Sequence, residues 1–222
     1  MLQAGYVGAQ AVHSAREIRA LTDKELAAHH ICALKSGALL VRIHSISKVS
    51  QALRREGKEL KANEFAEARN RRNRKIQEAF DKHWDFCPVY FFEAESSRDV
   101  REERLQNVFF LGEKLERDAH IDYPSGIYYT AEFGTVPSKP SEKIEVMYLS
   151  DKGKTEKTTR DNPTKAAGGY QALHIMNHRF QGLSRPFPYS VRTFDHFIFK
   201  RSPAAAVKRL NKRLRKAEQA CD

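Results

Sequence analysis

The sequence predicts a mixed α/β fold, in which a partly parallel sheet has helices on both faces and a basic C-terminal helix docks on it. Residues 38–43 are a nearly continuous apolar run of strand length, typical of a central strand covered on both faces. Strand and helix patterns then alternate up to Leu111, as in a parallel sheet with crossover helices. Ser202 followed by Pro203 marks a strong helix start near the end of the chain.

The N-terminal part, residues 1–36, is expected to be a helical segment in front of a single domain at 37–222. Capping-box spacing starts at Ser14 and again at Thr22, so one or two short helices should run to about Leu34. No repeat and no clear linker interrupts the rest of the chain, which favours one domain.

A long charged helical pattern follows the first strand and ends near His83, with a break expected at Gly57. Its middle, residues 69–75, has almost no apolar side chain, so we expect it to project into solvent. Further strands are expected at 86–92 and 108–111, with a short helix at 98–105 between them.

Short strands with short connections dominate the region after residue 111, which favours antiparallel additions to the sheet. The segment 150–167 is polar and rich in lysine, and we expect a mobile loop there. The expected strands are 127–133, 144–149, 170–176 and 190–194. In the last helix an apolar stripe must dock on a partner surface, and it consists of Val207, Leu210, Leu214 and Ala217.

Composition limits the classes of protein that the chain can belong to. Its 222 residues include 41% hydrophobic and 30% charged side chains, enough for a core and a solvated surface. No apolar stretch is long enough to cross a membrane. The three cysteines are far apart in the sequence and lack the spacing of metal ligands. One pair could form a disulfide. Cys87 lies in an apolar run and is expected to be a small buried residue. We therefore expect no metal and no cofactor.

The formal net charge of +11 predicts attraction to polyanions. Two basic segments supply the candidate contacts, one in the long helix and one in the C-terminal helix. Aromatic or polar side chains that could read nucleobases are not visible beside either segment, so any nucleic-acid binding should be independent of base sequence. The candidate polyanion-binding residues are Arg69, Arg71, Arg72, Arg74, Lys75, Lys208, Arg209, Lys212 and Arg213.

The motif Gly169-Tyr-Gln-Ala-Leu-His174 resembles the glycine-tyrosine-x-serine-leucine-histidine signature of the alarmone synthetases, which transfer pyrophosphate from ATP to GTP or GDP. The resemblance implies that Tyr170 stacks on a guanine base, that His174 lies in the same pocket and that Arg192 belongs to a later strand of the site. Pro188 and Ser190 stand where that family has a catalytic glutamate and a glutamine. The family's aspartate-containing strand also has no counterpart upstream.

A broader resemblance covers about residues 35–216. The stretches 37–42, 86–92, 185–194 and 200–214 are similar, in this order, to an uncharacterised family of bacterial α/β proteins. Members of that family often begin with a signal peptide that ends in alanine-glutamine, and residues 9–10 would fit such an end. The resemblance implies the periplasm or cell envelope if the start lies upstream, and the cytoplasm otherwise.

Together these patterns favour a non-enzymatic binding or accessory protein whose partner is an anionic macromolecule or an acidic protein. Two alternatives stay open. One is a nucleotide-binding pyrophosphotransferase with Tyr170, His174 and Arg192 in its site. The other is a structural subunit of an envelope complex, joined to another chain through the apolar stripe of the C-terminal helix.

Overall fold

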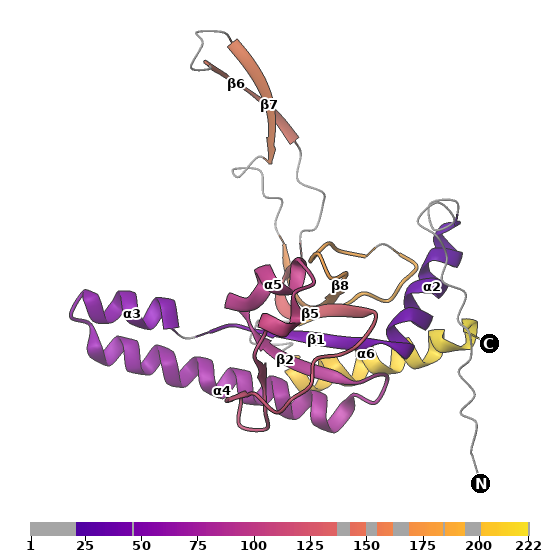
Figure 1. Ribbon diagram of the computed structural model, residues 1–222, viewed down its shortest axis with the longest axis horizontal. Helices are drawn as coiled ribbons and strands as arrows, with labels where there is room; N and C mark the ends of the chain where they lie inside the picture. Colours follow the sequence, from indigo (N-terminus) through magenta and orange to yellow (C-terminus); the bar gives the residue numbers. More distant parts are fainter. Residues whose placement is uncertain are drawn as a thin grey trace.

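The computed structural model describes residues 21–45, 47–136, 143–149, 155–161, 169–183, 185–193 and 201–221. Its centre is a seven-stranded mixed sheet with the order β4-β3-β2-β1-β5-β8-β9 (Figure 1). The three central strands, β2, β1 and β5, run parallel, and the neighbours on both sides are antiparallel. The predicted fold class is confirmed. The strands are β1 Ala38–Ile43, β2 Val89–Glu93, β3 Phe110–Leu111, β4 Arg117–Asp118, β5 Tyr128–Val136, β8 Tyr170–Met176 and β9 Ser190–Arg192.

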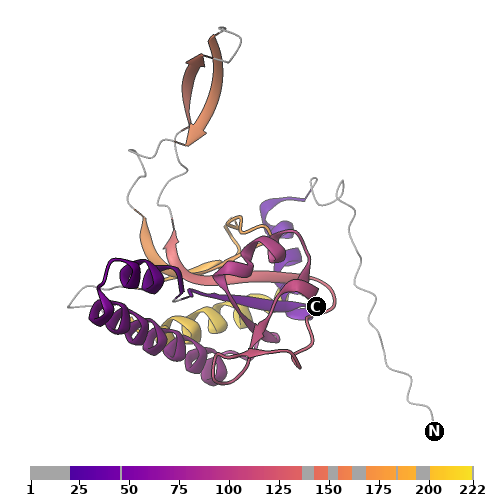
Figure 2. The same cartoon turned by 60° about the vertical axis from the view of Figure 1, so that its left-hand side comes forward.

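Three helices, α2 (Asp23–Ser36), α4 (Glu59–His83) and α6 (Pro203–Ala217), contribute to the larger core on one face of the sheet. Figures 1 and 2 show α4 and α6 side by side beneath the strands. Leu34, Phe80 and Leu210, one from each helix, are at most 1% exposed. Alternate residues of the strands supply the rest of this core, because successive strand side chains point to opposite faces.

The opposite face carries a smaller core under the short helix α5 (Ser97–Arg101) and the 3₁₀ turn η2 (Leu105–Asn107). Val100 and Leu105 from these elements pack against Phe92 and Tyr128 of the sheet. The Tyr128 hydroxyl donates to the Val100 carbonyl at 2.8 Å and thereby ties β5 to α5. Helices therefore cover both faces, as the sequence predicts, but the layer on this face is thin.

Helix ends follow the predicted signals. Thr22 and Glu25 form a complete capping box at the start of α2, whereas Ser14 lies outside the described residues. Gly57, with φ of 72°, separates α3 (Ser47–Arg55) from α4, as expected at the predicted break. The Ser202 hydroxyl accepts a hydrogen bond from the backbone of Ala205, with Pro203 at the first helical position.

Two pairing predictions are wrong. The strand at 108–111 was expected to be parallel, but β3 pairs antiparallel with β2. The connection between them contains α5 and η2 but no long helix of the kind that usually forms a parallel crossover. The strand expected at 127–133 as an antiparallel addition is instead β5, which pairs parallel with β1 at the centre of the sheet.

The loop predicted at 150–167 is also wrong in part. Residues 155–161 form β7 (Thr155–Asp161), which pairs antiparallel with β6 (Lys143–Leu149) as a separate two-stranded sheet. Figure 1 shows this hairpin beyond the main sheet, on the side of β5 and β8.

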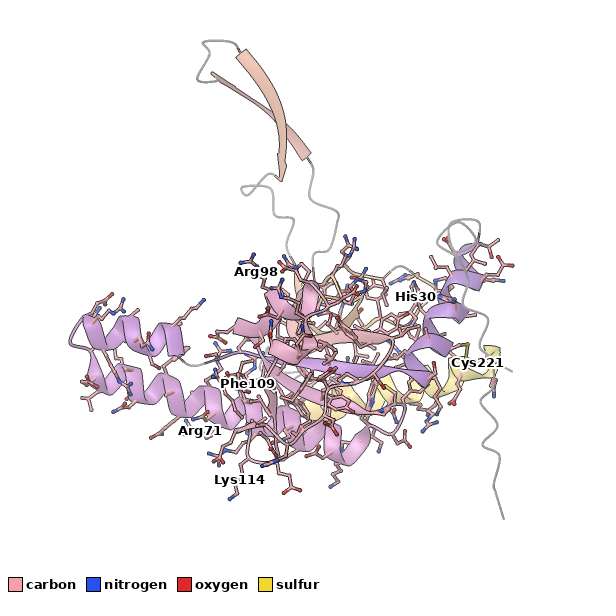
Figure 3. All side chains as sticks on the ribbon, viewed as in Figure 1. His30, Arg71, Arg98, Phe109, Lys114 and Cys221 are labelled. Carbon is pink, nitrogen blue, oxygen red and sulfur yellow. A yellow bond between two sulfur atoms is a disulfide. The ribbon has the colours of Figure 1, made fainter. Side chains whose placement is uncertain are left out.

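The C-terminal helix is fastened at its end as well as along its length. Val207, Leu210 and Leu214 are fully buried in the domain's own core, so the predicted stripe docks within this chain. A disulfide joins Cys32 of α2 to Cys221, just beyond α6 (Figure 3). Lys35 Nζ lies 2.9 Å from Glu218 Oε1 at the same junction. The apolar stripe that the envelope-subunit alternative would use to join another chain is therefore buried in the core of this one.

Candidate functional site

A line of polar side chains crosses neighbouring strands on the face of the sheet that carries the smaller core. Glu132 of β5 lies directly opposite His174 of β8, and His174 lies opposite Ser190 of β9. Arg42 of β1 reaches Glu132 from the other side, and its Nε lies 2.5 Å from Glu132 Oε2. Because the strands hold these residues in register, the side chains form one connected network rather than separate surface contacts.

The Arg42–Glu132 ion pair is largely buried. The two side chains are 22% and 11% exposed, and both Nε and Nη2 of Arg42 donate to Glu132 Oε2. Phe180 covers the Arg42 guanidinium, whose carbon lies 4.9 Å from the ring centroid. A charged pair at this depth is costly unless both partners are kept, so removing one of them should be strongly unfavourable.

His174 is the least solvated member of the network, with a side chain that is 9% exposed. Burial lowers its pKa, while the charge of Glu132 opposes that shift, so the imidazole is neutral near pH 7. Its Nε2 lies 3.5 Å from Glu132 Oε1, which favours the tautomer with the proton on Nε2. The Ala172 backbone is close enough to affect its pKa, but His174 Nδ1 has no partner with hydrogen-bonding geometry in the described part of the chain.

The outer end of the network combines an aromatic ring, a hydroxyl and a guanidinium. Tyr170 Oη lies 3.4 Å from Ser190 Oγ, so the two hydroxyls can share a hydrogen bond. The guanidinium carbon of Arg192 lies 4.2 Å from the centroid of the Tyr170 ring. Arg192 is exposed, and Tyr170 and Ser190 are half-buried. A planar, anionic ligand would meet a stacking surface and a positive charge here.

The Arg42 side of the network lies near the position where this sheet topology favours ligand binding. The chain leaves β1 towards β2 and leaves β5 towards β8, in opposite directions across the sheet. Ligands of open α/β sheets bind beyond the carboxyl ends of strands at such a switch point. Arg42 is the penultimate residue of β1 and lies at such an end, whereas Glu132 is at the middle of β5.

His44 connects this edge of the sheet to the basic part of α4. Asn73 of α4 is 6% exposed, and its Nδ2 donates to the His44 carbonyl at 3.1 Å. Burial lowers the pKa of His44; the charge of Glu132 opposes this effect, and Arg69, Arg42 and Arg72 reinforce it. A cavity of about 250 Å³ borders His44 and Asn73 at this point.

The prediction that residues 69–75 project into solvent holds for only part of the segment. Asn73 is buried, and Arg69 is half-buried, with its guanidinium carbon 5.3 Å from the centroid of the Phe65 ring. Arg71 is exposed on α4 (Figure 3) and pairs with Glu67, from which it is separated by one helical turn. The remaining exposed cations of the segment, which form no ion pair within the described residues, are Arg72, Arg74 and Lys75.

All four candidate cations of α6 are exposed: Lys208, Arg209, Lys212 and Arg213. They project from the side of the helix opposite its buried stripe. Arg213 also has a structural contact, because its Nη1 donates to the Ser190 carbonyl at 2.9 Å. Arg215 is engaged differently, since it pairs with Asp85 and Glu218 at the end of the helix.

The sequence-predicted nucleotide residues Tyr170, His174 and Arg192 therefore lie on one face of adjacent strands. The predicted polyanion residues lie on two different helices and do not form a single line with them. Arg42 and Glu132 were not identified as site residues from the sequence. Each is a charged side chain inside an otherwise apolar strand, which is the signal that could have revealed them.

No helix within the described ranges has the length and apolar character needed to cross a membrane. In the same part of the chain, no group of three or more metal-ligating side chains comes together. Comparison with protein-family models, with curated proteins and with solved structures finds no match.

Proposed function

We propose that this chain is a binding protein for a nucleoside polyphosphate, held at the outer end of the network around Tyr170. The observation that carries the proposal is the grouping of Tyr170, Ser190 and Arg192 at the exposed end of a buried polar network. The resemblance of residues 169–174 to the alarmone synthetase signature supports the same ligand class.

Each side chain has a chemical role in this proposal. The Tyr170 ring stacks on the base, and base–aromatic stacking contributes about 1–3 kcal/mol. Arg192 supplies a guanidinium that matches phosphate oxygens. His174 Nδ1 is buried and has no partner among the described residues, so it can accept a hydrogen bond only from a ligand group that enters the network. Arg42 and Glu132 hold His174 in position.

Isothermal titration of the whole chain with GTP and with ATP tests the proposal. We expect saturable binding between the micromolar and millimolar ranges, as for typical enzyme substrates. Tyr170→Ala should weaken binding about 5- to 150-fold, the loss expected for one stacking contact. Tyr123→Ala is the matched control, because Tyr123 is 53% exposed and lies outside the network. Equal heats from wild type and Tyr170→Ala would contradict the proposal.

Pyrophosphate transfer is the catalytic form of the same proposal. Incubating the chain with radiolabelled ATP and GTP, followed by thin-layer chromatography, would reveal a guanosine pentaphosphate product. Glu132→Gln should abolish this product if the carboxylate takes part in the reaction. Nucleotide binding without any product would leave a binding protein and exclude transfer between these two nucleotides.

A second candidate is polyanion binding along α4. It is favoured by the exposed cations Arg72, Arg74 and Lys75, which lack ion pairs within the described residues. Charge reversal in Arg72→Glu/Arg74→Glu should lower the salt concentration needed for elution from heparin. Lys61→Glu/Lys82→Glu changes two exposed cations of the same helix outside this segment. Equal shifts in both double variants would show only an effect of net charge.

A further inference from the structure

A groove lies between the proline-rich turn at 185–188 and the C-terminal half of α6. Its cavity of about 390 Å³ is bordered by Arg185, Pro186 and Tyr189 from the turn side and by Arg213 from the helix. No acidic side chain is among the residues that line it. The volume falls within the range typical of small-ligand pockets.

Additional arginines surround Arg213. Burial lowers the pKa of Arg213, and the charges of Arg209 and Arg201 lower it further. Arg209 is exposed on the next turn of α6, and Arg201 precedes the helix and donates from Nη1 to the Arg192 carbonyl at 2.6 Å. The hydrogen bond from Arg213 to the Ser190 carbonyl fixes the guanidinium at the groove wall.

We propose that this groove, hereafter the arginine groove (the cavity lined by Arg185 and Arg213), binds phosphate groups. Arg185 and Arg213 carry like charges at one cavity whose described lining residues include no carboxylate, and a bound anion would offset their mutual repulsion. Guanidinium groups also match phosphate oxygens bidentately. Two sources can carry the phosphate: free inorganic pyrophosphate, or the backbone of single-stranded nucleic acid.

The arginine groove is separate from the site of the proposed nucleotide. Ser190 lies between them: its hydroxyl faces Tyr170, and its carbonyl accepts from Arg213. Phe187 and Val191, next to the groove, pack in the larger core on the helical face of the sheet. The inference therefore stands whether or not the chain binds a nucleotide at Tyr170.

Two ligands distinguish the two sources of phosphate: a fluorescein-labelled twelve-nucleotide oligothymidylate, followed by polarisation, and inorganic pyrophosphate, followed by titration calorimetry. The test variant is Arg185→Gln/Arg213→Gln, in which both residues line the groove and both side chains are exposed. For the oligonucleotide, we expect the slope of log K against log salt to decrease in magnitude by about 1.4, or about 0.7 per lost phosphate contact. For pyrophosphate, we expect the wild type to bind and the variant to bind at least about tenfold more weakly. A tenfold loss of affinity corresponds to only about 1.4 kcal/mol of binding free energy.

The matched control is Lys208→Gln/Lys212→Gln, which removes the same total charge at two exposed residues of α6 that do not line the cavity. Binding of either ligand with loss only in the arginine variant supports the proposal and identifies the source. Equal loss in both variants, or no binding of either ligand at 50 mM salt, overturns it. Loss in Tyr170→Ala or Arg72→Glu/Arg74→Glu, with retention in Arg185→Gln/Arg213→Gln, also overturns it. The single variant Arg185→Gln repeats the test with α6 unchanged.

Discussion

Loss of the Cys32–Cys221 disulfide should destabilise this domain more than most single substitutions would. The bond closes a loop whose ends are 189 residues apart in the sequence. In the chain-entropy description, a loop of this length restricts the unfolded state by about 5 kcal/mol at 25 °C. For a chain of 222 residues, an unfolding entropy of about 2.1 cal/mol/K per residue converts this to a melting temperature lower by about 10 °C.

The assay is thermal unfolding followed by circular dichroism, with the number of free thiols counted in denaturant. Wild type should show one free thiol, that of Cys87, and each variant should be compared at the same protein concentration. Cys32→Ser, Cys221→Ser and the double variant should lose nearly the same stability, because each removes the same cross-link. Burial raises the pKa of Cys87 to about 12, so this thiol is a poor nucleophile for disulfide exchange.

Two results would refute this reasoning. If wild type with one free thiol melted at the temperature of the double variant, the cross-link would add no stability. If the losses in the two single variants added up in the double variant, the effect would come from the separate side chains. Addition of a dithiol reductant to wild type should reproduce the double variant, with both cysteines returned to thiols.

Three further predictions concern the core and the network. Gly37→Ala places a Cβ against the Ile127 carbonyl and should lower the urea midpoint of unfolding, whereas Gly182→Ala, with open space around it, should leave the midpoint nearly unchanged. Leu214→Ala should cost about 2–5 kcal/mol in the same urea assay, because the side chain is fully buried in α6. Burial lowers the pKa of His174 below its ordinary value of 6.5, so the unfolded chain takes up its proton first as pH falls. The free energy of unfolding should therefore decrease as the pH falls below 6.5, by up to about 1.4 kcal/mol per pH unit. In His174→Gln this pH dependence should be weaker.

Much of the fold could be predicted because its signals are local. The capping box at Thr22, the break at Gly57 and the start of α6 at Ser202 each depend on a few neighbouring residues. The central strand β1 also has a clear signal, because a strand that is covered on both faces is a nearly continuous apolar run, without alternating apolar and polar residues. Strand partners are different, because pairing depends on connections whose path the apolar pattern does not encode. For this reason β5 was expected as an antiparallel addition to the sheet but pairs parallel with β1 at its centre.

Only some of the residues of the candidate site could be predicted from the sequence, for a related reason. Tyr170, His174 and Arg192 lie in a motif and a strand that can be recognised along the chain. Glu132 is 42 positions from His174 and meets it only through the register of β5 with β8. The same holds for the disulfide, since spacing left open which cysteines pair, and only the docking of α6 beside α2 brings Cys221 to Cys32.

The Cys32–Cys221 bond makes nearly the whole domain a covalent ring. Cleavage of one peptide bond anywhere between these residues would not release a fragment. The nicked chain would keep the mass of the intact one under denaturing conditions and would separate into two pieces only after reduction. Limited proteolysis of this protein should therefore be compared on gels run with and without reductant, because the non-reducing gel alone would hide every cut inside the ring.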